Sequence, residues 1–270
     1  MAKRKTGWTE EKIAKYYKEG RGKGEFHNYK PWLTIQDVPS IGRSHRFKGW
    51  KSGRQHQLLS DLEKNYLLLM DWAEDVIDIR EQFPLDREYT MKIAEEKGIN
   101  HPVNNENGVP IVMTTDFLIS KSEGGEIKYL ARTTKYSKDL DEKRKIDLFE
   151  IERQYWEENQ VDFGIVTDKD IPVIFVENLK KFHKSYFSNH ENTFLKLMTQ
   201  LLRKENGRLI NFLNKFEEEY LSEPGEALSV FKHLVARKDI LLDMNTRFTP
   251  SKIDIAQLKI REENTDQMRV

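Results

Sequence analysis

The residues of this sequence that could do chemistry are an acid and a lysine on two neighbouring strand-like segments. Asp116 lies in one apolar, β-branched segment, and Lys135 ends the next one. The polar, glycine-rich stretch Lys121–Gly125 between them is typical of a hairpin turn. A turn about residues 123 and 124 places Asp116 opposite roughly residue 131. A carboxylate that holds an ion and a lysine that orients or activates water are components of metal-assisted phosphodiester hydrolysis.

A second acid, Glu63, borders the apolar face of a helix predicted over residues 57–73, with leucine and tyrosine side chains beside it at helical spacing. A buried carboxylate is costly unless a cation or hydrogen bonds compensate its charge, which favours a role for Glu63 beside Asp116. Ser60 and Glu63 also fit a capping box, in which Glu63 only completes the start of the helix. The sequence leaves both interpretations open.

A basic stretch without acids precedes this helix, from residue 38 to residue 60. Its cationic residues are Arg43, His45, Arg46, Lys48, Lys51 and Arg54. Phe47 and Trp50 are interleaved with them, and this composition suits contact with a phosphate backbone. Glycines and prolines predict an irregular conformation for residues 21–56, so a pair of solvated loops is the alternative interpretation.

The overall composition limits the possible classes of protein. The 270 residues include 45 basic and 45 acidic ones, and the resulting net charge of zero argues against a protein that coats nucleic acid non-specifically. Without cysteine there is no disulfide framework and no thiolate zinc site, which fits a reducing compartment. The sequence has no signal-peptide pattern and no apolar stretch of roughly 18 residues, so we expect a protein of the cell interior without membrane contact.

Helices and strands must bring the candidate residues together. A short helix is predicted over residues 8–20, where threonine can cap the start. Ahead of the hairpin, the apolar pattern predicts the helix over 57–73 and a strand over 76–85. After the hairpin it predicts a long helix over 139–160 and a buried strand over 161–167. This order predicts a mixed α/β sheet flanked by helices.

From residue 168 onward the pattern becomes mostly helical. Four helices are predicted, over residues 175–186, 191–203, 207–221 and 225–238. Two short strands follow, over 240–244 and 251–255. Helices followed by a two-stranded flap suggest a winged-helix-like module, a shape that serves DNA binding and protein contacts alike. We therefore expect a catalytic domain over residues 1–168 and this module over residues 169–270.

Several ordered stretches of the chain carry a resemblance to a known family. They are Glu19–Gly22, Pro31–Thr34, Gly42–Arg46, Leu58–Glu63, Asp78–Leu85, Thr115–Leu118, Glu150–Trp156 and Thr167–Lys169. On these stretches the sequence resembles the TnsA endonuclease subunit of heteromeric DNA transposases. The resemblance covers most of the chain and weakens beyond about residue 175.

The resemblance implies a restriction-endonuclease-like first domain. The family pattern has a Glu on a helix, an Asp on a strand, and a Gln or Glu two residues before a Lys on the next strand. Glu63, Asp116 and Lys135 match this pattern, whereas Thr133 stands where Gln or Glu is expected. The implied metal ligands are Glu63, Asp116 and the backbone carbonyl of Thr134, with Thr133 as a possible accessory group.

Lys128 competes with Lys135 for the role of the catalytic lysine. The stretch Glu126-Ile127-Lys128 is also an acid two residues before a lysine. It lies at the hairpin turn, however, past the end of the strand pairing expected for Asp116. This position favours Lys135.

The resemblance also implies a reaction and its setting. A magnesium-dependent DNA endonuclease, for which manganese substitutes, cuts the 5′ strands at transposon ends by hydrolysis during cut-and-paste transposition. A separate transposase subunit of the TnsB type cuts the 3′ strands, and an ATP-dependent regulator of the TnsC type controls both, in the bacterial cytoplasm. The basic residues between 43 and 54 are then expected to bind the DNA.

Three other functions stay open on the sequence alone. Because Thr133 replaces the expected Gln or Glu, one alternative is a catalytically weak scaffold that keeps its DNA and partner contacts in the same transposition complex. The implied fold also suits a stand-alone restriction or junction-resolving nuclease, which would cut DNA without partners. In the third alternative, the carboxylates are only helix caps and salt bridges of an α/β protein.

Overall fold

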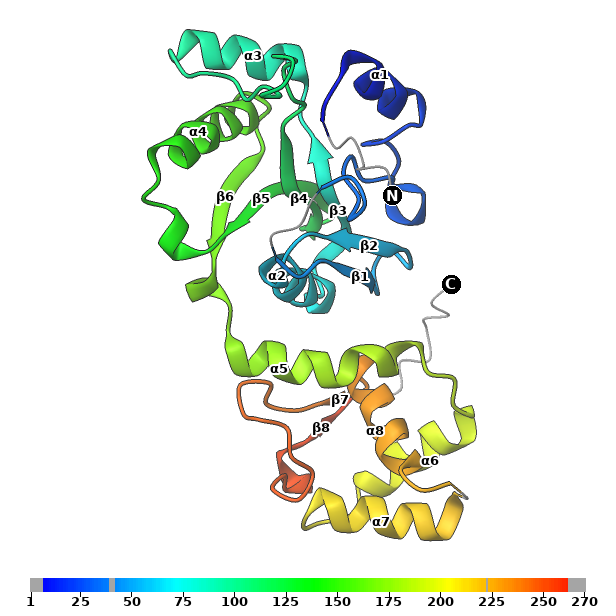
Figure 1. Ribbon diagram of the computed structural model, residues 1–270. Helices are drawn as coiled ribbons and strands as arrows, with labels where there is room; N and C mark the ends of the chain where they lie inside the picture. Colours follow the sequence, from blue (N-terminus) through cyan, green and yellow to red (C-terminus); the bar gives the residue numbers. More distant parts are fainter. Residues whose placement is uncertain (1–6, 39–41, 222, 262–270) are drawn as a thin grey trace. The chain divides into compact units, whose positions relative to one another are not determined.

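The computed structural model describes residues 7–38, 42–221 and 223–261 of the chain (Figure 1). The chain divides into two compact units, Met1–Ile171 and Pro172–Val270. The first unit carries the candidate residues, and the second is mostly helical. No helix in the described ranges is both long and apolar enough to cross a membrane.

A four-stranded mixed sheet forms the centre of the first unit. Its strands, in spatial order, are β3 (Val76–Pro84), β4 (Thr114–Glu123), β5 (Glu126–Lys135) and β6 (Asp162–Thr167). β4 is antiparallel to both β3 and β5, whereas β6 runs parallel to β5. A parallel neighbour needs a crossover connection, and α4 (Lys143–Glu158) makes it. The predicted mixed α/β sheet is confirmed.

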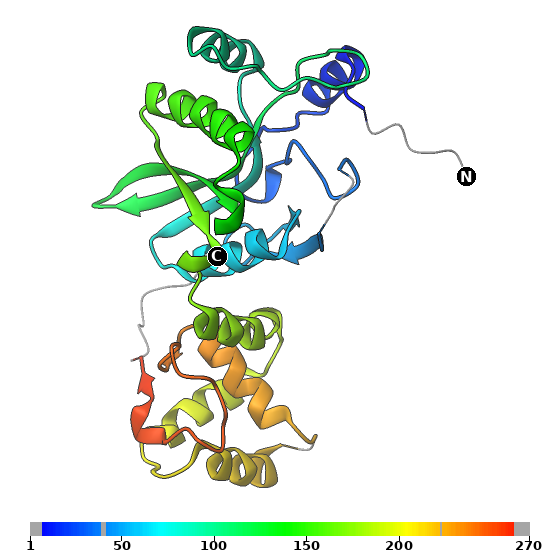
Figure 2. The same cartoon turned by 60° about the vertical axis from the view of Figure 1, so that its left-hand side comes forward.

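Helices cover both faces of this sheet, and α2 (Asp61–Trp72) and α4 lie on opposite sides of it in Figures 1 and 2. Phe117 and Leu118 are adjacent in β4 and therefore point to opposite faces. Tyr66 of α2 packs against Phe117, with ring centroids 5.6 Å apart. Leu118 joins a buried cluster with Trp156 of α4. Side chains from the two helices can therefore approach β4 and β5 from opposite faces.

Two further helices pack at the edges of the first unit. α1 (Glu10–Lys18) begins after Thr9, whose side chain accepts a 3.2 Å hydrogen bond from the backbone of the first turn, as predicted for a cap. The apolar cluster beneath it consists of Ile13, Tyr16, Trp32 and Val112. α3 (Arg87–Glu96) packs against α4 through Ile93 and Ile151.

The segment before α2 contains a strand pair, so the irregular conformation predicted for residues 21–56 is wrong for residues 45–48 and 55–56. β1 (His45–Lys48) and β2 (Gln55–Leu58) are antiparallel, and the chain reverses between them over Gly49–Gly53. Successive residues of β1 are alternately half-buried and exposed. This alternation is typical of a strand with one packed face, and polar residue types concealed it in the sequence.

The β4–β5 hairpin turns at Gly124–Gly125. Both glycines have positive φ, 61° and 89°, as a two-residue hairpin loop requires. The register pairs Phe117 with Arg132. The predicted pairing of Asp116 with roughly residue 131 is therefore wrong by two residues, because the turn uses the glycine pair and not the residues before it. Asp116 faces the last residues of β5.

Strand β3 changes the direction of its side chains at Gln82. The Arg80 guanidinium lies 5.7 Å from the ring centroid of Phe83, although residues three apart in a strand normally face opposite ways. Gln82 has a φ of 49°, which reverses the alternation. A buried non-glycine residue in this conformation costs about 1–3 kcal/mol. Contacts around Gln82 must therefore hold the backbone in place.

Over residues 172–221 and 223–261, the second unit contains four α-helices, namely α5 (Val173–Phe182), α6 (Asn192–Leu202), α7 (Leu209–Tyr220) and α8 (Glu226–Ala236). The four predicted helices are confirmed. β7 (Ile240–Leu241) pairs with β8 (Lys259–Ile260), so the second strand predicted over 251–255 is wrong. The Asp254 side chain accepts a hydrogen bond from Ala256 N at 3.1 Å and caps a short 3-10 helix there.

Candidate active site

Asp116 lies beside the end of β5. The backbone N–H and the hydroxyl of Thr134 both donate to Asp116 Oδ2, at 2.7 and 2.9 Å. Two donors on one oxygen fix the orientation of the carboxylate. Its other oxygen, Oδ1, accepts no hydrogen bond from any described residue. The carboxylate thus has one anchored oxygen and one oxygen available to a ligand.

Glu63 lies in the first turn of α2, next to the residue that caps this helix. Ser60 is the N-cap of α2, and its hydroxyl accepts a hydrogen bond from Glu63 N at 3.0 Å. The helix starts after Ser60, not at residue 57, because that residue belongs to β2. Glu63 Oε2 accepts hydrogen bonds from Leu59 N at 2.8 Å and from Gln82 Nε2 at 3.3 Å. The Glu63 side chain thus bonds to the residue before the N-cap and not to Ser60 N, so the predicted capping box is incomplete, and only 5% of Glu63 is exposed.

Lys135 ends β5 and acts electrostatically on the buried acids. Burial and then the charge of Asp116 raise the pKa of Glu63 well above its usual range, and the positive charge of Lys135 opposes this shift. Lys128, in contrast, lies near the tip of the hairpin, where it forms a 2.8 Å ion pair with Glu123. The structure therefore brings Glu63, Asp116 and Lys135 together and leaves Lys128 outside.

Glu152 of α4 is a further charged group of the site, which sequence reasoning missed. The hydroxyls of Thr115 and Thr133 each donate to Glu152 Oε1 at 2.6 Å. Trp156 Nε1 donates to the Thr115 hydroxyl at 2.7 Å. Glu152 precedes Trp156 by four residues, so both lie on one face of the helix, and this spacing was the available signal.

Thr133, the residue that departs from the family pattern, contacts this acid. Its hydroxyl donates to Glu152, so α4 supplies a carboxylate beside the position where β5 lacks one. Burial raises the pKa of Glu152 to about 7, although hydrogen bonds from threonine hydroxyls oppose this rise. Asp116 and Lys135 influence the pKa of Glu152 as well, in opposite directions. Both glutamates therefore respond to the same acid and lysine.

A cavity of about 640 Å³ opens onto this site. One part of its wall is formed by Asp116, Thr133, Lys135 and Glu152. The rest includes apolar side chains such as Trp8, Leu33, Val103, Met113, Leu148 and Phe149. Glu63 does not line the cavity. Within the described ranges, no three His, Asp or Glu side chains are arranged as a complete metal-binding group.

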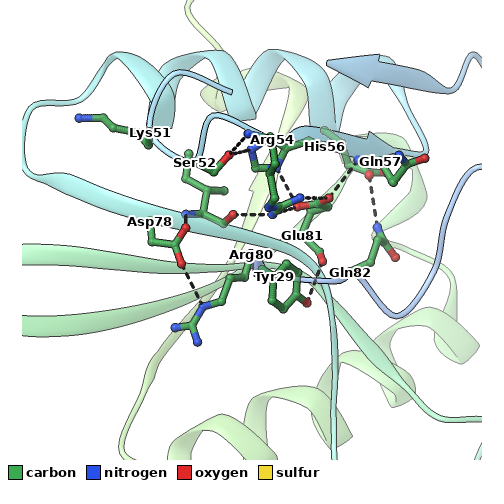
Figure 3. Close-up of polar contacts among 12 residues, drawn as sticks. Tyr29, Lys51, Ser52, Arg54, His56, Gln57, Asp78, Arg80, Glu81 and Gln82 are labelled. Atoms are coloured by element: carbon green, nitrogen blue, oxygen red, sulfur yellow. Dashed lines mark hydrogen bonds and ion pairs between the residues drawn. The ribbon is translucent and has the colours of Figure 1, made fainter. Parts of the chain in front are cut away.

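The predicted DNA-binding residues fall into two environments. Arg43, Arg46 and Lys48 are exposed, on or beside β1. Arg54 is buried, with 8% of its side chain exposed, and both of its terminal nitrogens bond to the fully buried Glu81 carboxylate (Figure 3). The prediction that Arg54 contacts DNA is therefore wrong, because its charge is needed to compensate Glu81.

The two remaining members of the basic cluster lie partly at the surface. His45 Nε2 lies 2.7 Å from Asp61 Oδ1, at the start of α2. The backbone N–H of Lys51 donates to Asp71 Oδ1 at 3.1 Å, and the residue is half-buried. Both remain candidates for phosphate contact, His45 with a carboxylate already beside it.

Comparisons with known proteins identify the family. Residues 73–168 match a family described as TnsA-like endonuclease N terminal, and residues 170–244 match one described as TnsA endonuclease C terminal. The chain is 39% identical over 259 residues to the Transposon Tn7 transposition protein TnsA of Escherichia coli, with 93% of each chain covered. The chain belongs to the TnsA family. It is an endonuclease subunit of a Tn7-like transposase.

The family match also bears on the rival functions. Asp116, Lys135 and Glu152 lie within the N-terminal TnsA match, whereas Glu63 precedes it. Similarity extends over nearly the whole chain, including the second unit. A TnsA endonuclease is thus favoured over the catalytically weak scaffold that Thr133 suggested.

Proposed function

We propose that the first unit is a restriction-endonuclease-like nuclease that hydrolyses the 5′ strands at transposon ends. The observation that carries this proposal is the position of Asp116, Lys135 and Glu152 on the wall of one cavity, with Thr133 and Thr134 hydrogen-bonded to the two acids. Buried carboxylates grouped around a lysine are a costly arrangement, and a metal-dependent phosphodiesterase has a use for it. Caps and salt bridges alone would not require these acids to be near each other.

The donor atoms fit magnesium, with manganese as a substitute. Asp116 has one oxygen anchored by two donors and a second oxygen that accepts no hydrogen bond from a described residue, and Glu63 Oε2 is likewise anchored by two donors. The Thr134 carbonyl is the third candidate ligand, since the N–H of that residue points to Asp116 and both groups of a strand residue point the same way. Carboxylate and carbonyl oxygens are the ligands that hard cations prefer. A bound ion would polarise the phosphate and favour ionisation of water.

The chain's own side chains account for the remaining needs of hydrolysis. The Lys135 amine can orient or deprotonate the attacking water and stabilise negative charge on the phosphate. Glu152 holds the Thr133 hydroxyl and adds negative charge beside Asp116. Exposed Arg43, Arg46 and Lys48, with His45 and Lys51, are proposed to contact the DNA backbone.

The partners follow from the same assignment. We propose a transposase subunit of the TnsB type and an ATP-dependent regulator of the TnsC type as the other members of the complex. A net charge of zero fits a nuclease that cuts only within an assembly, because strong independent binding to DNA requires an excess of basic residues. The second unit, over residues 172–270, is proposed to be a winged-helix-like module for DNA or partner contacts.

The test is strand-specific cleavage in the reconstituted complex, with end-labelled transposon DNA and magnesium or manganese. We expect 5′-strand cuts with the wild-type chain and none with Lys135→Ala. Equal absence of 5′ cuts in both would support the scaffold instead. Robust cutting by the purified chain alone would support a stand-alone nuclease.

A further inference from the structure

We infer that Gln82 is a positioning residue that fixes which oxygen of Glu63 faces the active site. This inference rests on the proposed metal site. The amide nitrogen of Gln82 donates to Glu63 Oε2 at 3.3 Å, and Leu59 N donates to the same oxygen at 2.8 Å. Because both donors engage Oε2, Oε1 is assigned to the ligand. Gln82 is itself buried, with 2% of the residue exposed.

The backbone conformation of β3 is what directs Gln82 toward Glu63. In the register of β3 and β4, Glu81 pairs with Phe117 and Phe83 with Thr115, so Gln82 lies opposite Asp116. The φ of 49° at Gln82 interrupts the ladder at this position. Gln82 thus lies next to Asp116 in the sheet and contacts Glu63 through its side chain.

Hydrogen bonds from the N-terminal segment hold this conformation. Trp32 N donates to the Gln82 carbonyl at 3.1 Å, and the Tyr29 hydroxyl donates to the Glu81 carbonyl at 3.0 Å. Neither carbonyl therefore depends on the interrupted ladder. The backbone around Gln82 is braced independently of the Gln82 side chain.

A buried group of ion-paired side chains, Arg54, His56 and Glu81, holds the same stretch of β3 (Figure 3). Arg54 bonds to the Glu81 carboxylate and also donates to the Ile79 carbonyl at 2.9 Å. His56 Nδ1 lies 2.7 Å from Glu81 Oε2. These contacts do not touch the active site directly, yet they fix the strand that carries Gln82. The group therefore supports the backbone next to Gln82.

Two substitutions separate the amide contact from the backbone. Gln82→Met keeps the length of the side chain and removes the donor. Gln82→Asn keeps an amide and a residue type that tolerates positive φ, but its amide falls one bond short of Glu63. Gln55→Met, at an exposed position of β2, is the matched control for the chemical change.

The decisive measurement is the manganese affinity of the purified full-length variants, by calorimetry or by electron paramagnetic resonance. We expect Gln82→Met and Gln82→Asn to raise the Mn²⁺ Kd about 10-fold to 100-fold, the usual effect of losing a partner of a metal ligand. Gln55→Met should bind as the wild type does. In the reconstituted complex, high manganese should restore 5′ cutting by both Gln82 variants without a change in the KM for DNA.

An Asp116→Asn variant distinguishes failure of this inference from failure of the metal site itself. If Asp116→Asn abolishes binding while both Gln82 variants bind manganese within twofold of the wild type, the role of Gln82 is refuted. If Asp116→Asn also binds normally, the proposed metal site is wrong. Thermal unfolding identifies a variant that fails to fold, and in that case the other Gln82 variant decides the matter.

Discussion

Arg54 offers the sharpest contrast between an exposed DNA contact and a buried structural cation. In the first unit its guanidinium bonds to both oxygens of Glu81, whose side chain is fully buried. Arg54→Met removes one partner of a buried ion pair and leaves the other charge uncompensated, which costs about 3–5 kcal/mol. For a unit of this size the loss corresponds to a fall in Tm of roughly 6–20 °C.

Arg46→Met is the control, because it makes the same chemical change on the exposed side of β1. We expect this variant to stay within about 0.5 kcal/mol of the wild type in the free energy of unfolding. In the assembled complex it should weaken DNA binding and reduce the dependence of affinity on salt. Urea unfolding followed by circular dichroism measures the first effect, and filter binding at several salt concentrations measures the second. Equal stability of the two variants would refute the structural role assigned to Arg54.

Three further predictions concern the acids and the lysine. Glu152→Ala leaves the buried hydroxyls of Thr115 and Thr133 without an acceptor, at about 1–3 kcal/mol each. Glu152→Gln keeps an acceptor oxygen, so chemical unfolding should show it to be the more stable of the two variants. Lys135→Ala should abolish 5′ cutting and Lys128→Ala should not, as measured on labelled ends, because only Lys135 acts on the site. Burial alone would raise the pKa of Glu81, but the neighbouring His56 and Arg54 charges hold this pKa well below its usual range. The ionised Glu81 carboxylate therefore stabilises the fold at pH values above its unfolded pKa of about 4.3. This stabilisation fades as the pH falls below that value. Unfolding of wild type and Glu81→Gln from pH 7 to pH 3 should accordingly give a stability difference that shrinks in acid.

Local patterns were sufficient to predict much of the fold. The glycine-rich turn between two apolar segments predicted the β4–β5 hairpin, and apolar periodicity predicted α2, α4 and the four helices of the second unit. Glu63 could be found because a carboxylate beside an apolar stripe is expensive. These features depend on residues near one another in the chain, which is why a single sequence reveals them.

Features set by distant partners could not be predicted. Thr115 and Thr133, which bind Glu152, lie 37 and 19 residues away from it in the chain. Arg54 and Glu81 are 27 residues apart, so the basic stretch gave no sign that one of its cations is buried. Gln82 has a positive φ, although this conformation is uncommon for glutamine. In each case tertiary contacts override the local preference.

The anomalous signal of manganese in soaked crystals of the protein would show where the first unit binds the ion. We expect an ion between Asp116 and Glu63, within coordination distance of Asp116 Oδ1, and its loss in Asp116→Asn. An ordered ion elsewhere in the first unit, or a full-occupancy ion that persists at this position in Asp116→Asn, would contradict this expectation.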